Sequence, residues 1–564
     1  MKKYNVVWIY VDSVRNYHTE GDDRSRLSMM DFYGEESCEF LNAVTSAPST
    51  WMSVTAMLTG LPSVFIAKNF NDFYFDNSYF DSIVKILSNE GYDCNFLLHS
   101  RRSRELFNNF CPIIDRKFWP KGLKHRYKKW PNKVLNMVLK NYLAATPKEP
   151  FFLFMGYNCR LDYSTSDVVD HAIKLFKSNG YNENNTIFVL CSDHGYPDPS
   201  KDWTPEKFKS LGIGHDLLLS DDNIEVPLFI NYPGSPKGIK IPYVVSLIDV
   251  FPTIMSILSI YDDEHIEKKF YGKNLKPLIE NKKSISDLKN RFVRTDNRLF
   301  CQDNRGTSIR GNSYKYLYYH DRPRGDNEEF YDLELDPKEV NNVLLENTSY
   351  SSKELHRYRK EFLSQQNHAS KFQVEHSIHR LKRSIENEKS IRFADLSKIL
   401  IFGKFPLVFL EHLSEIIKDL LSNGKVSYLL DDSLKDSMGF ASHNDLDFFN
   451  SKKLSHSYFK NYDFDKFDLV LVPIDVNNAM TYDQHSVKSG EEIFAITEYL
   501  NSNKVFLLDY NMNIIRNNSS LKLQIKKKFW DKRNIYMSEP SLLLIDIFKY
   551  LSILLTKNKK VASK

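Results

Sequence analysis

The chain has 564 residues, which is too long for one ordinary hydrophobic core, so we expect two domains. Its 42% hydrophobic and 26% charged residues are typical of a soluble globular protein. The net charge of +5 is modest, and basic runs such as residues 121–129 indicate solvated faces, which argues against a nucleic-acid partner and leaves an anionic substrate open.

No targeting, disulfide or membrane signal stands out. The six cysteines show no paired spacing and are interpreted as small core residues. The first expected strand starts at about residue 4, without an apolar leader before it. Residues 541–555 are apolar but interrupted by Asp546 and Lys549, which predicts an amphipathic helix rather than a membrane span. We therefore expect a cytoplasmic protein without membrane insertion, and the oligomeric state stays open.

Residues 1–260 alternate candidate strands with candidate helices. The apolar runs predict strands over residues 5–11, 94–98, 150–156, 186–191 and 226–231. Helical patterns lie over residues 53–59, 80–90, 131–144, 167–179 and 249–259. This alternation predicts an α/β fold in which helices cover both faces of a mainly parallel sheet.

The pattern changes towards the C-terminus. Residues 290–345 predict a small antiparallel subdomain, with strands at 313–319 and 329–333, and the charged residues 346–392 predict a helical linker. A second alternation in 393–564 predicts a smaller Rossmann-like α/β domain, with strands at 398–402, 425–430, 469–473 and 504–508 and helices at 406–422 and 491–501. Its first strand is followed by one glycine only, which favours a structural or recognition role over cofactor binding.

Chemically active side chains follow two of the predicted strands. Asp193 and His194 come at the end of run 186–191, and Asp12 ends the first strand in the same way. Parallel strands present such residues at one edge of their sheet, where α/β proteins bind ligands and metals. The hydroxyl-rich turn 45–50 lies between them in the chain, so a metal-assisted nucleophile site is a plausible hypothesis.

Residues 4–345 resemble the sulfatase-like branch of the alkaline phosphatase superfamily. Six segments in the same order carry this resemblance, namely residues 5–12, 48–60, 186–195, 226–230, 248–254 and 330–339. It implies an alkaline-phosphatase-like fold and a nucleophile ten residues before Gly60, which is Thr50, with Ser49 and Ser53 as rivals. It also implies that Asp12, Thr50, Asp193 and His194 hold a divalent metal ion.

The resemblance implies further site residues. His215 stands where the family places a residue that contacts the anion or the leaving group, and it would act as a general acid. Arg160 occupies the place of a substrate-contacting histidine in sulfatases and is a candidate anion clamp. His99 is a candidate substrate-binding residue for a different reason, because it follows the predicted strand 94–98 at the edge of the sheet. For each of the three, an ordinary structural role, such as a surface ion pair or a bond to the backbone, remains open.

Departures from the family pattern guide the choice of metal and reaction. Ser13 replaces a second acid and His194 offers a nitrogen, which favours one zinc or manganese ion over calcium and leaves a second metal open. Sulfatases oxidise a cysteine or serine at the nucleophile position, and here Thr50 stands there. We therefore predict a phosphoric-ester hydrolase or phosphotransferase acting on a phosphorylated sugar or glycan-type substrate, as in phosphoethanolamine and phosphoglycerol transferases.

Two alternatives stay open. One is a sulfuric-ester hydrolase that works by direct attack or after an atypical maturation. The other is a catalytically inactive binding module.

Overall fold

A computed structural model describes the fold. The described residues are 3–17, 33–66, 80–99, 110, 116–119, 131–159, 165–198, 217–281, 290–297, 306–320, 327–345, 352–386, 398–403, 425–431, 446–449, 469–474, 505–509 and 514–515. The chain divides into two compact units, residues 1–376 and 377–564.

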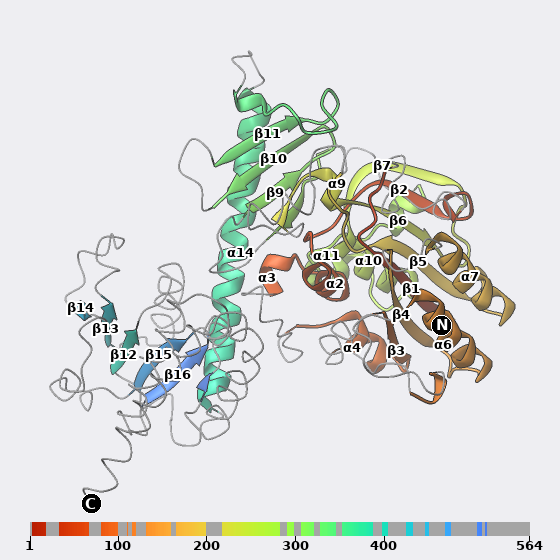
Figure 1. Ribbon diagram of the computed structural model, residues 1–564, viewed down its shortest axis with the longest axis horizontal. Helices are drawn as coiled ribbons and strands as arrows, with labels where there is room; N and C mark the ends of the chain where they lie inside the picture. Colours follow the sequence, from red (N-terminus) through yellow and green to blue (C-terminus); the bar gives the residue numbers. More distant parts are fainter. Residues whose placement is uncertain are drawn as a thin grey trace, which may run out of the picture. The chain divides into compact units, whose positions relative to one another are not determined.

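A seven-stranded sheet forms the centre of the first unit (Figure 1). Its strands lie in the order β3-β4-β1-β5-β6-β2-β7. Their bounds are β1 (Asn5–Asp12), β2 (Cys38–Val44), β3 (Asp93–Leu98), β4 (Phe151–Asn158), β5 (Thr186–Ser192), β6 (Glu225–Asn231) and β7 (Ile239–Ser246). β6 runs antiparallel to both its neighbours, and the other neighbouring pairs are parallel. The predicted mainly parallel sheet is therefore confirmed.

Helices cover both faces of this sheet. One face carries α2 (Thr50–Thr59), α4 (Ile83–Asn89), α10 (Val250–Ile257), α11 (Asp263–Lys269) and α12 (Lys276–Ile279), and the other carries α6 (Asn132–Ala144) and α7 (Thr165–Ser178). Successive side chains of a strand point to opposite faces, so Trp8 packs on the first side while Val7 and Ile9 pack on the second.

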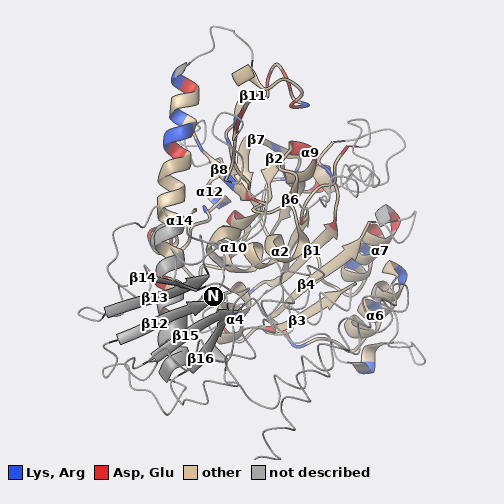
Figure 2. Ribbon diagram, turned by 60° about the vertical axis from the view of Figure 1, so that its left-hand side comes forward, with Lys and Arg blue, Asp and Glu red and all other residues tan. Residues whose placement is uncertain are grey.

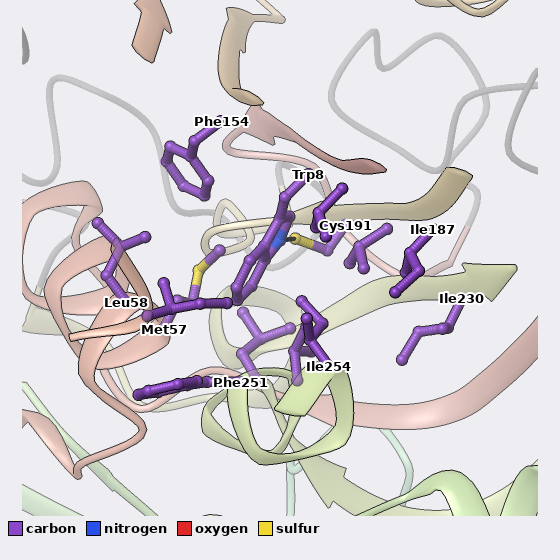
Figure 3. Packing of buried hydrophobic residues seen from close by; sticks show 14 of the residues in the cluster. Trp8, Met57, Leu58, Phe154, Ile187, Cys191, Ile230, Phe251 and Ile254 are labelled. Atoms are coloured by element: carbon purple, nitrogen blue, oxygen red, sulfur yellow. Dashed lines mark hydrogen bonds between the residues drawn. The ribbon is translucent and has the colours of Figure 1, made fainter. Parts of the chain in front are cut away.

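The packing around Trp8 fixes the helix that carries Thr50 (Figure 3). The indole Nε1 of Trp8 donates to Cys191 Sγ at 3.4 Å, and Phe154 lies edge-on to the indole with 5.6 Å between ring centroids. Met57 of α2 and Phe251 of α10 belong to the same buried cluster. Because α2 packs on the central strands in this way, its first turn has a defined position relative to their ends.

A four-stranded antiparallel sheet follows, as the sequence predicted. It consists of β8 (Val293–Asp296), β9 (Gly306–Arg310), β10 (Tyr314–Tyr319) and β11 (Glu328–Asp332) in the order β11-β10-β9-β8. Buried charges connect it to α9 (Asp221–Ile224), because Lys315 Nζ lies 2.7 Å from Asp221 Oδ1 and 2.5 Å from Glu339 Oε1. Arg310 also contacts Asp221, at 3.0 Å, and so ties β9 to the same carboxylate.

One long helix, α14 (Ser352–Glu386), occupies most of the segment for which a helical linker was predicted. Its charged residues are both acidic and basic (Figure 2). Tyr358 and Phe362 pack against the antiparallel sheet, and Phe372 stacks on Phe65 of α3 (Ser63–Ile66) with 4.7 Å between centroids. Despite its charge, the helix therefore contributes side chains to the core of the first unit.

The second unit contains a six-stranded sheet. Its strands are β12 (Lys398–Gly403), β13 (Lys425–Asp431), β14 (Leu446–Phe449), β15 (Leu469–Ile474), β16 (Val505–Asp509) and β17 (Ile514–Ile515). The order is β14-β13-β12-β15-β16-β17, parallel except for β17. Strand orders of this kind occur in Rossmann folds, but the expected helices at 406–422, 491–501 and 541–555 lie outside the described residues. The Rossmann-like assignment therefore stays a prediction.

Two smaller expectations concern cysteines and membranes. Cys38, Cys94, Cys159 and Cys191 are buried free thiols, as expected for small core residues, whereas Cys111 and Cys301 lie outside the described residues. Within the described segments, no helix is both long and apolar enough to cross a bilayer.

Candidate metal centre

The carboxyl ends of β1 and β5 bring Asp12, Asp193 and His194 together. The two strands are parallel neighbours, with Val11 paired to Ser192, so the residues that end or follow them meet at one edge. His194 Nε2 lies 3.7 Å from Asp12 Oδ1 and 3.8 Å from Asp193 Oδ2. One ligand atom from each residue lies within 4.8 Å of the other two, which is a spacing suited to a single cation.

Asp193 has the environment of a carboxylate that binds a cation. The side chain is fully buried, and its Oδ1 accepts hydrogen bonds from the backbone N–H groups of Ser13 and His194, at 3.2 and 2.9 Å. Its Oδ2 has no hydrogen-bond partner among the described residues. Burial raises the pKa of Asp193 to about 6, and Asp12 also raises it, while His194 and the nearby hydroxyl of Thr50 lower it. A buried carboxylate oxygen of this kind is normally satisfied by a proton or a cation.

The tautomer of His194 suits a ligand. Its Nδ1 lies 2.7 Å from the carbonyl oxygen of Gly195, and because a carbonyl can only accept, the proton belongs on Nδ1. The lone pair on Nε2 then points into the group of carboxylates. Histidines that bind metals are commonly held by such a bond from their other ring nitrogen.

Gly195 lets the loop after the ligands pack tightly. Its N–H donates to Asn223 O at 2.9 Å, and a Cβ at this position would lie 2.3 Å from the carbonyl oxygen of Asp222. Only glycine permits this approach without a shift of backbone. Asp193 and His194 therefore lie between a strand end and a clamped loop.

Thr50 reaches the same group of atoms from α2. It is the first residue of the helix, and its Oγ1 lies 3.2 Å from His194 Nε2. Ser53 is fully buried, where its hydroxyl donates to the backbone oxygen of Asp193 at 2.6 Å and accepts from Thr45 at 2.8 Å. Ser49 Oγ is buried without a hydrogen-bond partner in the described part of the chain. Thr50 therefore reaches the ligand side chain of His194, whereas Ser53 bonds to the backbone of Asp193 rather than to its carboxylate.

His99 lies next to Asp12 Oδ2, whereas His194 lies next to Asp12 Oδ1. Its Nε2 is 3.7 Å from Asp12 Oδ2, and the side chain is only 2% exposed. Its Nδ1 lies 3.2 Å from the carbonyl oxygen of Gly156 and therefore carries the proton. The residue borders a candidate ligand, and substrate binding by His99 stays a prediction.

Two polar residues near the ligands were not predicted to contact them, although the sequence drew attention to Ser13 as the replacement of a second acid. Ser13 has a positive φ of 67°, and its hydroxyl donates to Asp12 Oδ1 at 2.7 Å. Asn158 ends β4, is paired in register with Asp12 and donates from Nδ2 to Asp12 Oδ2 at 3.1 Å. The available signal was a polar side chain at the end of a buried strand, the same signal that identified Asp12.

Arg160 and His215 lie outside the described residues. Their roles as a phosphate or sulfate clamp and as a general acid therefore stay predictions.

Two family models match the first unit. The model described as Sulfatase matches residues 157–260, and the model described as N-sulphoglucosamine sulphohydrolase, C-terminal, matches residues 215–368. The first match includes Asp193 and His194.

The similar curated proteins are also sulfatases. A sulfatase of Formosa agariphila is 29% identical over 180 residues, an arylsulfatase of Clostridium perfringens is 30% identical over 189 residues, and human arylsulfatase K is 27% identical over 167 residues. The alignments take in 32%, 32% and 28% of this chain and 29%, 35% and 27% of the relatives. The chain thus spans about a third of the length of the curated relatives it matches.

Among solved structures, a 2-O GAG sulfatase has a similar fold. The TM-score is 0.50 at 16% sequence identity, and the match covers 65% of this chain and 93% of that structure. This likeness supports the shared fold and extends well beyond the segment that the family models match.

These comparisons correct the predicted reaction. The prediction of a phosphoric-ester hydrolase or phosphotransferase is wrong, because the matching family models and the similar proteins are sulfatases. The prediction weighed a few departures from the family pattern, above all Thr50 at the nucleophile position. Sulfuryl and phosphoryl esters are both tetrahedral anions that need a cation and a nearby nucleophile, so the residue type at one position discriminates poorly between them. The alternative of sulfuric-ester hydrolysis is the better supported one.

Proposed function

We propose that this chain, which belongs to the sulfatase/alkaline-phosphatase-like superfamily, is a metal-dependent hydrolase of sulfuric esters. The observation that carries the proposal is the convergence of Asp12, Asp193 and His194 beside the hydroxyl of Thr50. The sulfatase relatives then favour a sulfate ester as the bond that is broken.

The donor set fits a divalent cation. Two carboxylates and one imidazole approach each other through acceptor atoms, and Asp193 Oδ2 is buried without a hydrogen-bond partner among the described residues. Zinc and manganese accept such mixed oxygen and nitrogen ligands more readily than calcium does. When bound, the cation would withdraw electron density from the sulfuryl oxygens and favour the deprotonated hydroxyl of Thr50.

The position of Thr50 suits attack on an anion. It lies in the first turn of α2, where backbone N–H groups and the positive end of the helix favour negative charge. In the proposed reaction, Thr50 Oγ1 bonds to sulfur as the bond from sulfur to the alcohol oxygen breaks, and the alcohol takes up a proton. Water then hydrolyses the threonine sulfate, releasing sulfate and restoring the hydroxyl.

A sulfated saccharide is the proposed substrate class. One matching family model is named for an N-sulphoglucosamine sulphohydrolase, and the structural neighbour is named as a GAG sulfatase. Arg160, His99 and His215 are the proposed substrate-binding and proton-donating residues. The proposed division of the chain is a catalytic domain over 1–345, a helical linker over 346–392 and a Rossmann-like domain over 393–564, in a cytoplasmic protein.

The test compares two chromogenic esters with the purified full-length chain. With manganese or zinc added, p-nitrophenyl sulfate should be hydrolysed faster than bis-p-nitrophenyl phosphate. Thr50→Ala should lower sulfatase turnover by at least about a thousandfold, as removal of a nucleophile does. The matched control is Thr55→Ala, which removes a hydroxyl from the same helix that donates to its own backbone, at Trp51 O.

Three results bear against the proposal. Faster turnover of the phosphodiester would contradict the reaction class. Full sulfatase activity in the Thr50→Ala variant would exclude Thr50 as nucleophile. The absence of turnover of both esters, together with no bound divalent cation, would favour a non-enzymatic binding module.

A further inference from the structure

We infer that Asn158 is a positioning residue that orients Asp12 towards the cation. Asn158 is the last residue of β4, and the parallel ladder pairs it directly with Asp12 of β1. Its side-chain Nδ2 donates to Asp12 Oδ2 at 3.1 Å and lies 3.3 Å from His99 Nε2. The inference rests on the cation site of the proposed function but not on which ester is cleaved.

The two oxygens of Asp12 face different neighbours. Oδ2 is held by the Asn158 amide, whereas Oδ1 accepts from the Ser13 hydroxyl at 2.7 Å and faces His194 Nε2 at 3.7 Å. A carboxylate anchored at one oxygen has a restricted rotation about its last side-chain bond. The amide therefore keeps Oδ1 directed at the point where the lone pair of His194 also points.

Asn158 can serve as an anchor because its own backbone is fixed. Asn132, the first residue of α6, accepts from Asn158 N at 3.1 Å and donates to Asn158 O at 2.8 Å. Both asparagine side chains are almost fully buried, at 0% and 1% exposure. His99 holds the other side of the amide, since its Nε2 lone pair accepts from the same NH₂ group.

A neutral amide suits this place better than an ion. A carboxylate there would repel Asp12, and an ammonium group would compete with the cation for it. The NH₂ group donates to both Asp12 and His99 while leaving the net charge of the ligand set unchanged.

The test measures cation affinity in the full-length chain, by calorimetric titration with manganese chloride. Asn158→Ala and Asn158→Leu both remove the donors, and the leucine also preserves side-chain volume. Outer residues that orient a ligand typically change metal affinity by about 10–100-fold, so we expect binding at least about tenfold weaker in both variants.

Asn136→Ala is the matched control. Asn136 is also buried, but its amide donates to Val168 O at 2.7 Å and accepts from Tyr157 at 2.6 Å. This variant should lose thermal stability and keep manganese affinity within about twofold, because its amide does not bond to a ligand residue.

The inference is overturned if either folded Asn158 variant binds manganese as tightly as the wild type, if Asn136→Ala weakens binding equally, or if the wild type binds no manganese. Weaker manganese binding in the Asn158 variants of a chain that leaves p-nitrophenyl sulfate intact would refute the proposed reaction and uphold the positioning role. The two proposals can therefore fail separately.

Discussion

At the scale of single residues, Asp193 is fully buried and lies close to a second carboxylate, Asp12, and both properties disfavour its ionised form. Full burial raises its pKa to about 6, and the Asp12 carboxylate adds to this effect, while His194 lowers the pKa. An unperturbed aspartate has a pKa of about 3.9, so the folded protein without metal holds a proton that the unfolded chain releases between these values. Such a group stabilises the fold at low pH, and this contribution is lost as the pH rises through about 6.

A cation can replace that proton, which predicts a pH-dependent metal affinity. Because Asp193 must be deprotonated to bind, the apparent affinity for manganese should fall by about tenfold per pH unit below about 6. Thermal unfolding with and without manganese measures this, since a ligand raises the midpoint in proportion to the logarithm of its occupancy. We expect a small increase of the midpoint at about pH 5 and a clearly larger one at about pH 7.5. Equal increases at both pH values would contradict the role of Asp193.

The sequence was sufficient to place Asp12, Asp193 and His194 at one edge of the sheet, because each follows an apolar run. It was not sufficient to identify Asn158, or to show that Ser13, noted only as the replacement of a second acid, bonds to Asp12. Asn158 becomes relevant only through its register with Asp12, and Ser13 through its backbone turn with φ of 67°. Register and turn conformation depend on tertiary contacts that no local pattern specifies.

At the scale of secondary-structure elements, the strands with uninterrupted apolar runs were predicted closely and the interrupted ones were missed. β2 contains Glu39 and Asn42, and β7 contains Pro242, so neither has the apolar run of a buried parallel strand. They lie together at one end of the sheet, where β7 is the edge strand. Proline is tolerated there because an edge strand leaves some of its N–H groups without a ladder partner.

The start of α2 was also misplaced. The sequence predicted a helix from residue 53, and the helix begins at Thr50, with Ser49 in an extended conformation as its N-cap. Serine and threonine have low helix propensity and favour turns, which hid the first turn. The difference matters because it places Thr50 at the helix N-terminus.

The antiparallel sheet depends on a buried cluster with more carboxylates than cations. Asp221, Glu225 and Glu339 share Arg310 and Lys315. Burial raises the pKa of Asp221, but the charges of Arg310 and Lys315 outweigh burial and lower this pKa to about 2. For Glu339, burial and the Asp221 charge outweigh Lys315 and raise the pKa to about 7. Glu339 is therefore a carboxyl of this cluster that keeps its proton up to about neutral pH, which relieves the excess of negative charge.

The raised pKa of Glu339 predicts that the stability of the fold depends on pH, and that the Glu339→Gln variant lacks this dependence. An ordinary glutamate has a pKa of about 4.3, so the stabilising contribution of protonated Glu339 should be lost as the pH rises from about 4.3 to about 7. Glutamine keeps an acceptor for Lys315 and cannot ionise. In urea unfolding, the wild type should lose stability relative to the variant over that range.

Lys315→Met provides the contrast, because it leaves buried carboxylates without their cation and should destabilise the first unit by about 3–5 kcal/mol. A wild type and a Glu339→Gln variant with parallel pH profiles would show that folding does not raise the pKa of Glu339.

At the scale of the whole molecule, the two units differ in what they contribute to the proposed chemistry. The candidate ligands all lie in residues 1–376, and the described residues of 377–564 contribute none. The sequence alone did not allow a correct choice between sulfate and phosphate esters. That choice depends on a few atoms at the cation, whereas the family is recognised from the pattern of a whole domain.

The division into two units predicts two separate unfolding transitions in calorimetry, of which manganese should shift only one. A ligand present at about 100 times its dissociation constant stabilises the unit that binds it by about 2.7 kcal/mol, which corresponds to an increase of a few degrees. Asp193→Asn should abolish that increase and leave the other transition unchanged, because the substituted residue lies in residues 1–376. Equal shifts of both transitions would mean either that the units unfold together or that residues 377–564 also bind the cation.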